Sequence, residues 1–239
     1  MTRARVALQP AWVLHLRPYR DTSLLLEVFT RDHGRVGLVA RGARRPRSRQ
    51  SAVLQVLQPL LLSWQGAGEL VTLTQAEAAG AAARIQGEAL FAALYANELL
   101  LRLAARHDPH PGLFDSYAAL LRQLELREDP GVQLRLFERD LLQNLGYGLN
   151  LTHHAGNSQP LQAESLYAYD EERGAIPSDQ SDLPQISGAS LLSLADGTLR
   201  PAQALEVKPI LQRALHRHLG ERGLQTPRLL RALRDVVKA

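Results

Sequence analysis

The spacing of apolar residues changes once along the chain, and this change constrains the fold more than any other feature. Up to about residue 80, apolar residues fall in short runs, several of which alternate with polar residues as β-strands do. From Glu88 onward the spacing becomes about 3.6 residues, the period of an α-helix. The sequence therefore predicts a β-rich domain over residues 1–80 and a helical domain over residues 81–239.

Five short strands are expected in the first domain. They cover residues 12–16, 23–30, 35–39, 60–64 and 69–74. Turn residues separate the second strand from the third and the fourth from the fifth. Five strands with one longer connection, residues 41–58, fit a small closed barrel of the oligonucleotide- and oligosaccharide-binding (OB) type. An SH3-like barrel would give a similar pattern.

The second domain is predicted to combine helices with one polar insertion. Helices are expected from about residue 88 to before Pro109, over residues 113–126, from an N-cap at Asp129 to Gly146, over 190–194 and 201–219, and after Pro227. Residues 150–187 are polar and contain one short strand-like piece at 166–169. The expected class is α+β multidomain: an N-terminal OB-fold barrel followed by a helical domain that carries the insertion.

Positive charge is concentrated in the first quarter of the chain. Residues 1–60 hold eleven arginines and three acidic residues, whereas acidic residues outnumber basic ones in the remainder, so that the net charge is only +4. This asymmetry indicates a face that binds a polyanion, the simpler alternative being an ordinary basic surface.

The densest part of this charge is residues 41–51, with five arginines and no acid: Arg41, Arg44, Arg45, Arg47 and Arg49. Like charges this close repel, so the segment should be mobile without a counter-anion, and a phosphodiester backbone supplies one. Few aromatic residues are available for base stacking, which predicts binding that is mainly electrostatic and nearly blind to sequence. Five phosphate contacts on a single strand would give a log–log salt slope of about −3.5. A merely solvated loop is the alternative.

Catalytic, metal-binding and membrane-spanning features are not predicted. The chain has no cysteine, and His153 and His154, adjacent on an extended segment, point to opposite sides. No nucleophile motif or phosphate-binding loop occurs, so no catalytic residue, metal or cofactor is expected, and a hydrolase using His153 or His154 with nearby acids is kept as an alternative. The longest uncharged stretch, residues 50–68, is too polar for a membrane span, and a cytoplasmic protein is expected.

The helix that begins near Asp129 carries two arginines four residues apart. Arg135 and Arg139 are expected on its polar side, and Glu138 can compensate Arg135 locally. The alternative is an acidic partner peptide that lies over an apolar groove with Arg135 at its rim. Asn97 and Glu98, in an otherwise apolar helix, are explained by a hydrogen bond between helices.

Several short motifs occur in a fixed order between residue 12 and about residue 150. They are Val13-Leu14-His15, Arg17-Pro18, Glu27-Val28-Phe29-Thr30, Gly34-Arg35-Val36, Leu38-Val39-Ala40-Arg41-Gly42-Ala43-Arg44, Tyr95-Ala96-Asn97-Glu98-Leu99-Leu100, Leu134-Arg135-Leu136-Phe137-Glu138 and Leu145-Gly146-Tyr147-Gly148. As an ordered set they resemble the RecO family, bacterial recombination mediators of DNA repair.

The resemblance implies binding of single- and double-stranded DNA, annealing of complementary strands and cooperation with RecR in loading RecA, in the cytoplasm and near the nucleoid. It also implies contact with the acidic, apolar C-terminal tail of single-stranded-DNA-binding protein (SSB). The expected DNA-binding residues are Arg35, Arg41, Arg44, Arg45, Arg47 and Arg49. Arg135, which falls on the motif arginine associated with the tail, and Arg139 are the expected tail-binding residues.

The resemblance further implies a zinc-finger-like insertion, here in a degenerate form. In zinc-binding members, cysteine pairs follow the Gly-Tyr-Gly segment, whereas here His154 takes the place of the first cysteine and no others follow. We therefore expect residues 150–187 to keep the shape of the insertion without zinc. An RNA-binding OB factor without a recombination role remains the alternative function, and competition between RNA and single-stranded DNA would separate the two.

Overall fold

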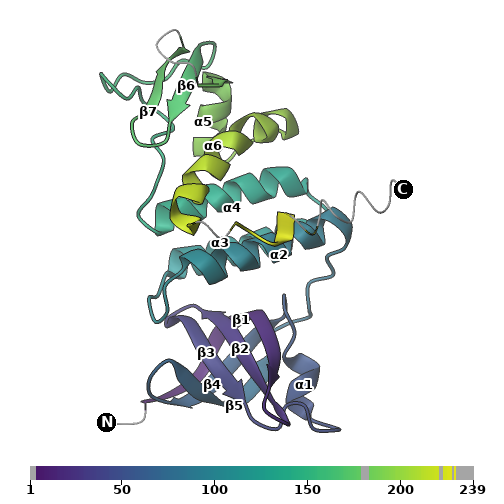
Figure 1. Cartoon of the computed structure of the whole chain (residues 1–239). Coiled ribbons are helices and arrows are strands. Elements are labelled where there is room, and N and C mark those ends of the chain that lie inside the picture. The colour runs from purple at the N-terminus through teal and green to yellow at the C-terminus, as the bar shows by residue number, and fades with distance from the viewer. Residues whose placement is uncertain (1–3, 179–182, 221–222, 228, 230–239) are drawn as a thin grey trace. The chain divides into compact units, whose positions relative to one another are not determined.

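A computed structural model of the chain describes residues 4–178, 183–220, 223–227 and 229 (Figure 1). The chain divides into two compact units. The first comprises residues 1–125 and 224–239, and the second comprises residues 126–223. Residues 81–125, which the sequence assigns to the helical domain, thus belong to the compact unit of the barrel. The predicted domain limits at residue 80 and at 150–187 stay predictions. The helix expected after Pro227 lies mostly outside the described residues.

The first unit contains a closed five-stranded barrel. Its strands are β1 (Ala4–Tyr19), β2 (Ser23–Thr30), β3 (Gly34–Ala40), β4 (Pro59–Gly66) and β5 (Leu70–Ala78), with the short helix α1 (Arg49–Val53) between β3 and β4. The order around the barrel is β1-β2-β3-β5-β4, with β3 and β5 parallel and the other pairs antiparallel. This closed arrangement is OB-like, as the sequence predicts.

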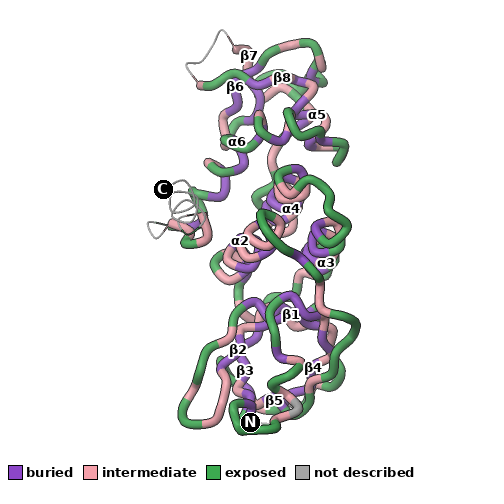
Figure 2. The backbone as a smooth tube through the Cα atoms, turned by 90° about the vertical axis from the view of Figure 1, so that its right-hand side faces the viewer, coloured by how far each residue is buried: buried purple, intermediate pink, exposed green. Residues whose placement is uncertain are grey.

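The first strand is much longer than the predicted 12–16, because it pairs with two neighbours. Its first part pairs with β4 and its second part with β2, and each register shifts once along the strand. Bulges of this kind bend a strand, which allows one strand to close a small barrel. The interior is filled by aliphatic side chains such as Val13, Leu26, Leu38 and Leu62, each essentially inaccessible to solvent (Figure 2).

The first unit also contains the helices α2 (Gly87–Leu103) and α3 (Pro111–Glu125). Trp12 of β1 packs edge-on against Tyr117 of α3, with ring centroids 5.6 Å apart, and Phe29 of β2 lies 5.8 Å from Phe114. These contacts bury the aromatic side chains of one barrel end against the helices.

A buried polar chain joins the same elements. The Tyr117 hydroxyl donates to Asn97 Oδ1, and Asn97 Nδ2 donates to the Leu14 carbonyl at 3.2 Å. Asn97 therefore makes the hydrogen bond between helices that the sequence predicts, and it also reaches the barrel. Burial raises the pKa of Tyr117, which keeps its hydroxyl protonated and able to donate.

The second unit is built from α4 (Pro130–Asn144), α5 (Gly188–Asp196), α6 (Pro201–Leu219) and a small sheet. Asp129 caps α4 by accepting from the Val132 amide at 2.9 Å, as predicted. The sheet has the order β7-β6-β8, formed by β6 (Leu166–Asp170), β7 (Gly174–Pro177) and β8 (Gln185–Ser187). The sequence predicts only β6, because β7 and β8 are too short to show a period.

The small sheet is joined to the helices by one carboxylate. Glu206 of α6 accepts from the Ser187 amide at 2.6 Å and from the hydroxyls of Ser187 and Ser190. Ser187 also caps α5 by accepting from the Ser190 amide. The insertion is therefore a folded part of the second unit with its own buried residues, including Tyr167, Tyr169 and Ile186.

Replacing Tyr117 by Phe should lower the free energy of unfolding of the first unit by about 1–3 kcal/mol, because Asn97 Oδ1 loses a donor in a buried site. Urea titration monitored by circular dichroism measures the change. Tyr19→Phe is the matched control, since Tyr19 is partly exposed and should change stability by less than about 0.5 kcal/mol. Equal values for the two variants would contradict the role given to the polar chain.

Candidate nucleic-acid interface

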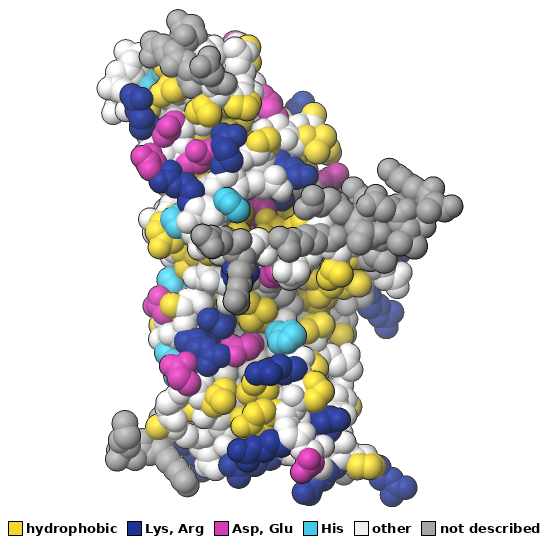
Figure 3. Space-filling view, in the orientation of Figure 1, with side chains coloured by type: hydrophobic (Ala, Val, Ile, Leu, Met, Phe, Trp, Pro, Cys, Tyr) yellow, Lys and Arg dark blue, Asp and Glu magenta, His cyan; other side chains and the backbone are white. Residues whose placement is uncertain are grey.

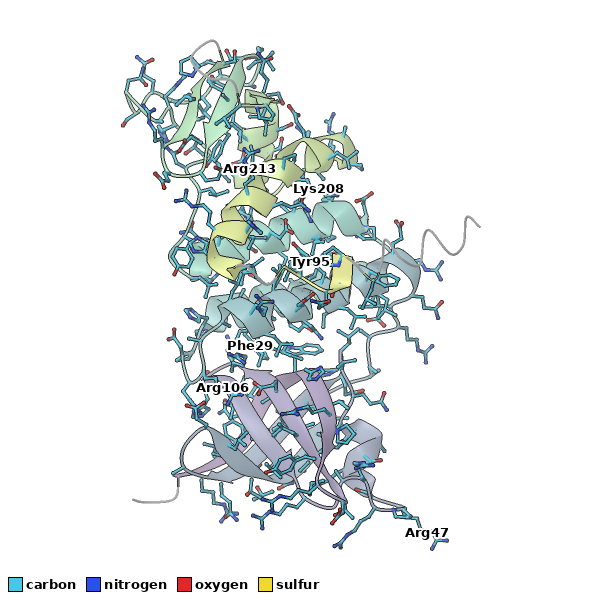
Figure 4. All side chains as sticks on the ribbon, viewed as in Figure 1. Phe29, Arg47, Tyr95, Arg106, Lys208 and Arg213 are labelled. Atoms are coloured by element: carbon cyan, nitrogen blue, oxygen red, sulfur yellow. The ribbon has the colours of Figure 1, made fainter. Side chains whose placement is uncertain are left out.

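The arginine-rich segment lies between β3 and α1, at the barrel end away from α2 and α3. Figure 4 shows Arg47 at this end, extending away from the barrel, and Phe29 at the opposite end that faces the helices. Arg41, Arg45 and Arg47 are exposed. Successive turns, with the Arg45 amide donating to the Gly42 carbonyl and the Ser48 amide to the Arg45 carbonyl, shape the segment. Its predicted mobility stays a prediction.

Arg44 fastens this segment to the hairpin between β1 and β2. Its amide donates to the Thr22 carbonyl at 2.8 Å, and its guanidinium Nη1 lies 3.3 Å and 3.4 Å from the carbonyls of Arg20 and Asp21. Arg44 is thus a connection between two loops as well as a positive charge. Arg49 begins α1, and its side chain lies outside the described part of the chain.

The hairpin brings two further arginines to the same end of the barrel. Arg17 and Arg20 are exposed, and they belong to the final part of β1 and the turn that follows it. We call Arg17, Arg20, Arg41, Arg45 and Arg47 the basic end of the barrel; Lys and Arg side chains gather there in Figure 3. Sequence reasoning did not select Arg17 or Arg20. The signal that could have identified them is their position at the predicted hairpin between the first two strands, which ends beside the arginine-rich segment.

Arg35 has a different environment from the loop arginines. Its Nη1 lies 3.1 Å from Glu27 Oε2, its Nε donates to the Ala104 carbonyl at 3.0 Å, and its side chain is only 17% exposed. Glu27 also pairs with Arg106, which in turn pairs with the exposed Glu69 at 3.1 Å. The guanidinium of Arg35 therefore serves mainly to connect the barrel to the segment after α2.

Arg135 is not on the polar side of its helix, so that part of the sequence prediction is wrong. It is 4% exposed and lies beside Glu138, which is fully buried, with Arg135 Nη2 2.9 Å from Glu138 Oε1. The local compensation by Glu138 that the sequence predicts is confirmed. Among the described residues, Arg135 Nε and Nη1 are buried without a hydrogen-bond acceptor. A guanidinium in this state can receive an additional anion.

Arg139 uses its donors within the second unit. Nη1 donates to the carbonyls of Leu194 and Ala195 at 2.6 Å and 3.1 Å, and Nε and Nη2 bond to Asp140. The two carbonyls belong to the last turn of α5, where a cation is favourable. Arg139 therefore ties α4 to α5, and a binding role for it would have to compete with these bonds.

The two histidines of the insertion have different partners among the described residues. His153 Nδ1 lies 2.8 Å from Thr152 Oγ1, whereas His154 packs edge-on against Tyr167. Among the described residues, no three His, Asp or Glu side chains converge as metal ligands would. This donor set does not fit the four-ligand site of a structural zinc ion. Burial raises the pKa of Tyr169, whose hydroxyl donates to the Asn150 carbonyl inside the same insertion.

A shallow cavity in the second unit is lined by Tyr147, Glu171, Glu172 and Arg217, among others. Tyr147 stacks on His218 with centroids 3.8 Å apart, and the resulting desolvation, followed by the charge of Arg217, lowers the pKa of His218. Arg213 and Arg217 of α6, the former labelled in Figure 4, pair with Glu171 and Glu172. Because the charges here are already paired, this cavity is a weaker candidate than the basic end of the barrel.

The described part of the chain contains no helix that is both long and apolar enough to span a membrane.

The structure thus defines a protein with an OB-like barrel and a helical C-terminal part. Two family models cover almost all of the chain: "Recombination protein O N terminal" matches residues 5–82 and "Recombination protein O C terminal" matches residues 84–227. The chain belongs to the RecO family.

Curated relatives agree with this assignment. A protein of Nitrosococcus oceani named DNA repair protein RecO is 50% identical over 97% of this chain and 96% of its own length. Proteins of the same name from Azoarcus sp. and Methylococcus capsulatus are 43% and 45% identical, over 98% and 96% of this chain and over 99% and 95% of their own lengths.

Replacing Glu27 by Gln should lower the free energy of unfolding by about 1–3 kcal/mol, because Arg35 and Arg106 would then face each other without the carboxylate between them. Glu69→Gln is the matched control, since Glu69 pairs with the same Arg106 but is 75% exposed, and it should cost less than about 0.5 kcal/mol. Denaturant titration of both variants gives the comparison. A Glu69 variant as unstable as the Glu27 variant would show that the partly buried network is unimportant.

Proposed function

We propose that this chain acts in recombinational DNA repair by binding single- and double-stranded DNA and annealing complementary strands. With RecR, it would help to load RecA onto single strands coated with SSB. Membership of the RecO family supports a role in DNA repair and recombination. The binding and annealing steps are proposed from the charge of the barrel.

The observation that carries the proposal is the basic end of the barrel. The five exposed arginines named above lie there with Arg44, which is also exposed, and Asp21 is the acid between them. Arg44 holds the loops together through three backbone oxygens, so the charges remain concentrated despite their repulsion. Planar guanidinium groups can each bind two phosphate oxygens, and such contacts position a strand without reading its sequence.

Annealing follows from the same charges. Two DNA strands repel through their phosphates, and a protein surface with excess positive charge lowers this repulsion while it holds one of them. Base pairing then supplies the sequence recognition, which the protein does not need to provide. The mechanism requires no covalent step.

Arg135 supports the proposed contact with the SSB tail. Its Nε and Nη1 atoms have no acceptor in the described part of the chain, and a carboxylate that reached either of them would accept a charge-assisted hydrogen bond. Arg139 already bonds to Leu194, Ala195 and Asp140, so its part in the proposal is to hold α5 beside α4.

Replacing Arg41, Arg45 and Arg47 together by Ala should weaken binding of single-stranded DNA and reduce the slope of log K against log salt by about 2, because each lost phosphate contact removes about 0.7. Fluorescence anisotropy at several salt concentrations measures both quantities. Annealing of SSB-coated complementary strands should slow in parallel.

The matched control for this variant removes the same net charge elsewhere: Arg84, Arg122 and Lys208, all exposed, are replaced by Ala. Its salt slope should stay close to that of the unmodified protein. An equal loss in both triple variants would indicate that only net charge matters, and tighter binding of RNA than of DNA would favour an RNA-binding factor instead.

Removing Arg135 should weaken binding of the SSB tail and spare DNA binding. Because Arg135→Ala alone would leave Glu138 buried beside a lost cation, the test uses Arg135→Met with Glu138→Leu, which replaces both charges by apolar groups. Anisotropy with a labelled tail peptide should show at least a roughly tenfold loss of affinity, the value expected when a charge-assisted bond worth about 1.5–3 kcal/mol is removed. Unchanged peptide affinity would reject Arg135 as the tail residue; Lys208→Ala is the exposed control.

A further inference from the structure

Three of the four aromatic side chains in residues 1–80 are used by packing. Trp12, Phe29 and Trp64 are buried, in contact with Tyr117, Phe114 and His33 respectively. Only Tyr19 is partly exposed. Among the Phe, Trp and Tyr rings of the barrel, Tyr19 is therefore the one that can stack on a nucleobase.

Tyr19 also lies at the basic end of the barrel. It is the last residue of β1 and pairs with Ser23 across the hairpin, whose carbonyls at Arg20, Asp21 and Thr22 receive the bonds from Arg44. The Arg20 guanidinium lies 5.3 Å from the centroid of the Tyr19 ring. A ring, a cation above it and the arginine loop are thus held together by backbone hydrogen bonds.

The backbone at this end has two arginines in conformations that other residues adopt more easily. Arg20 and Arg47 have φ angles of 50° and 64°, in the left-handed region that favours Gly and Asn. Folding alone would be served as well or better by Gly or Asn at these positions. Replacement of either arginine by Asn should therefore keep the backbone conformation and remove only the charge.

We propose that Tyr19, together with Arg20, stacks on a base of single-stranded DNA while Arg41, Arg45 and Arg47 hold its phosphates. This inference rests on the proposed function, and it adds what the loop arginines cannot supply. Phosphate contacts alone are made equally by any strand, whereas the face of a base is open to a protein ring only where the strand is unpaired. Tyr19 therefore determines the preference for single strands, and after annealing the paired base leaves the ring.

The test compares two oligonucleotides of equal length and charge: oligo-dT and an abasic strand that has the same phosphates without bases. The unmodified protein should bind oligo-dT more tightly. Tyr19→Ala should weaken oligo-dT binding by about 5-fold to 100-fold, the range of one base–aromatic stack, and leave binding of the abasic strand unchanged. Tyr19→Phe, which keeps the ring, should behave like the unmodified protein. The triple loop variant should weaken both ligands by the same factor.

Each outcome separates this inference from the proposed function. If neither oligonucleotide binds in dilute buffer, the proposed DNA-binding function fails. If both bind equally well to the unmodified protein, electrostatic binding stands and base stacking is rejected. If Tyr19→Ala weakens the abasic strand as much as oligo-dT, the ring only supports the loop structure, and the inference is again overturned.

Two further variants guard against a folding defect. Tyr19→Leu retains an apolar side chain at the hairpin and should show the same selective loss for oligo-dT as Tyr19→Ala. Arg20→Asn keeps a residue that tolerates the observed φ angle but removes the cation beside the ring, so its thermal unfolding temperature should not fall while oligo-dT affinity does. If Tyr19→Leu binds oligo-dT as tightly as the unmodified protein, stacking by Tyr19 is rejected.

Discussion

The bonds that Arg44 makes to the β1–β2 hairpin decide what the basic end of the barrel can do. These bonds, together with the carboxylate of Asp21 in the same hairpin, offset the repulsion between the like-charged side chains of the two segments. The Arg44 guanidinium and amide donate to three backbone carbonyls and so keep the loops together, and the guanidinium retains its positive charge. The remaining arginines are then presented to solvent as a group, which is the condition for binding a polyanion strongly.

The barrel has two ends with opposite chemistry, and this follows from its small size. One end packs against α2 and α3, where Trp12 and Phe29 are buried and Asn97 and Tyr117 are hydrogen-bonded to each other. The other end carries the arginines and Tyr19. Three of the four Phe, Trp and Tyr side chains of the barrel are buried by packing and cannot contact bases. Charge must therefore provide most of the proposed affinity for DNA.

The sequence was sufficient to predict elements whose period is long enough to recognise. The OB-like barrel, the helices from α2 to α6 and the cap at Asp129 are confirmed by the structure. The sequence did not predict that β1 pairs with both β2 and β4, because bulges interrupt its alternation of apolar and polar residues. It also did not predict β7 and β8, because strands of three or four residues are too short to show an alternation. Arg17 and Arg20 were missed for another reason: the hydrogen bonds that bring them to the loop connect residues about 24 positions apart.

Arginines that look alike in sequence differ in how many of their donors are already used. Arg35 donates to Glu27 and to the Ala104 carbonyl, and Arg139 donates to Asp140 and to the Leu194 carbonyl. Both side chains therefore stabilise the fold. Arg41, Arg45 and Arg47 are exposed, and Arg135 is buried with two donors that lack an acceptor in the described part of the chain. A buried donor without a partner is costly, whereas an exposed one is solvated. The proposed DNA contact therefore depends on concentrated positive charge. The proposed tail contact depends on two buried Arg135 donors that lack an acceptor in the described part of the chain.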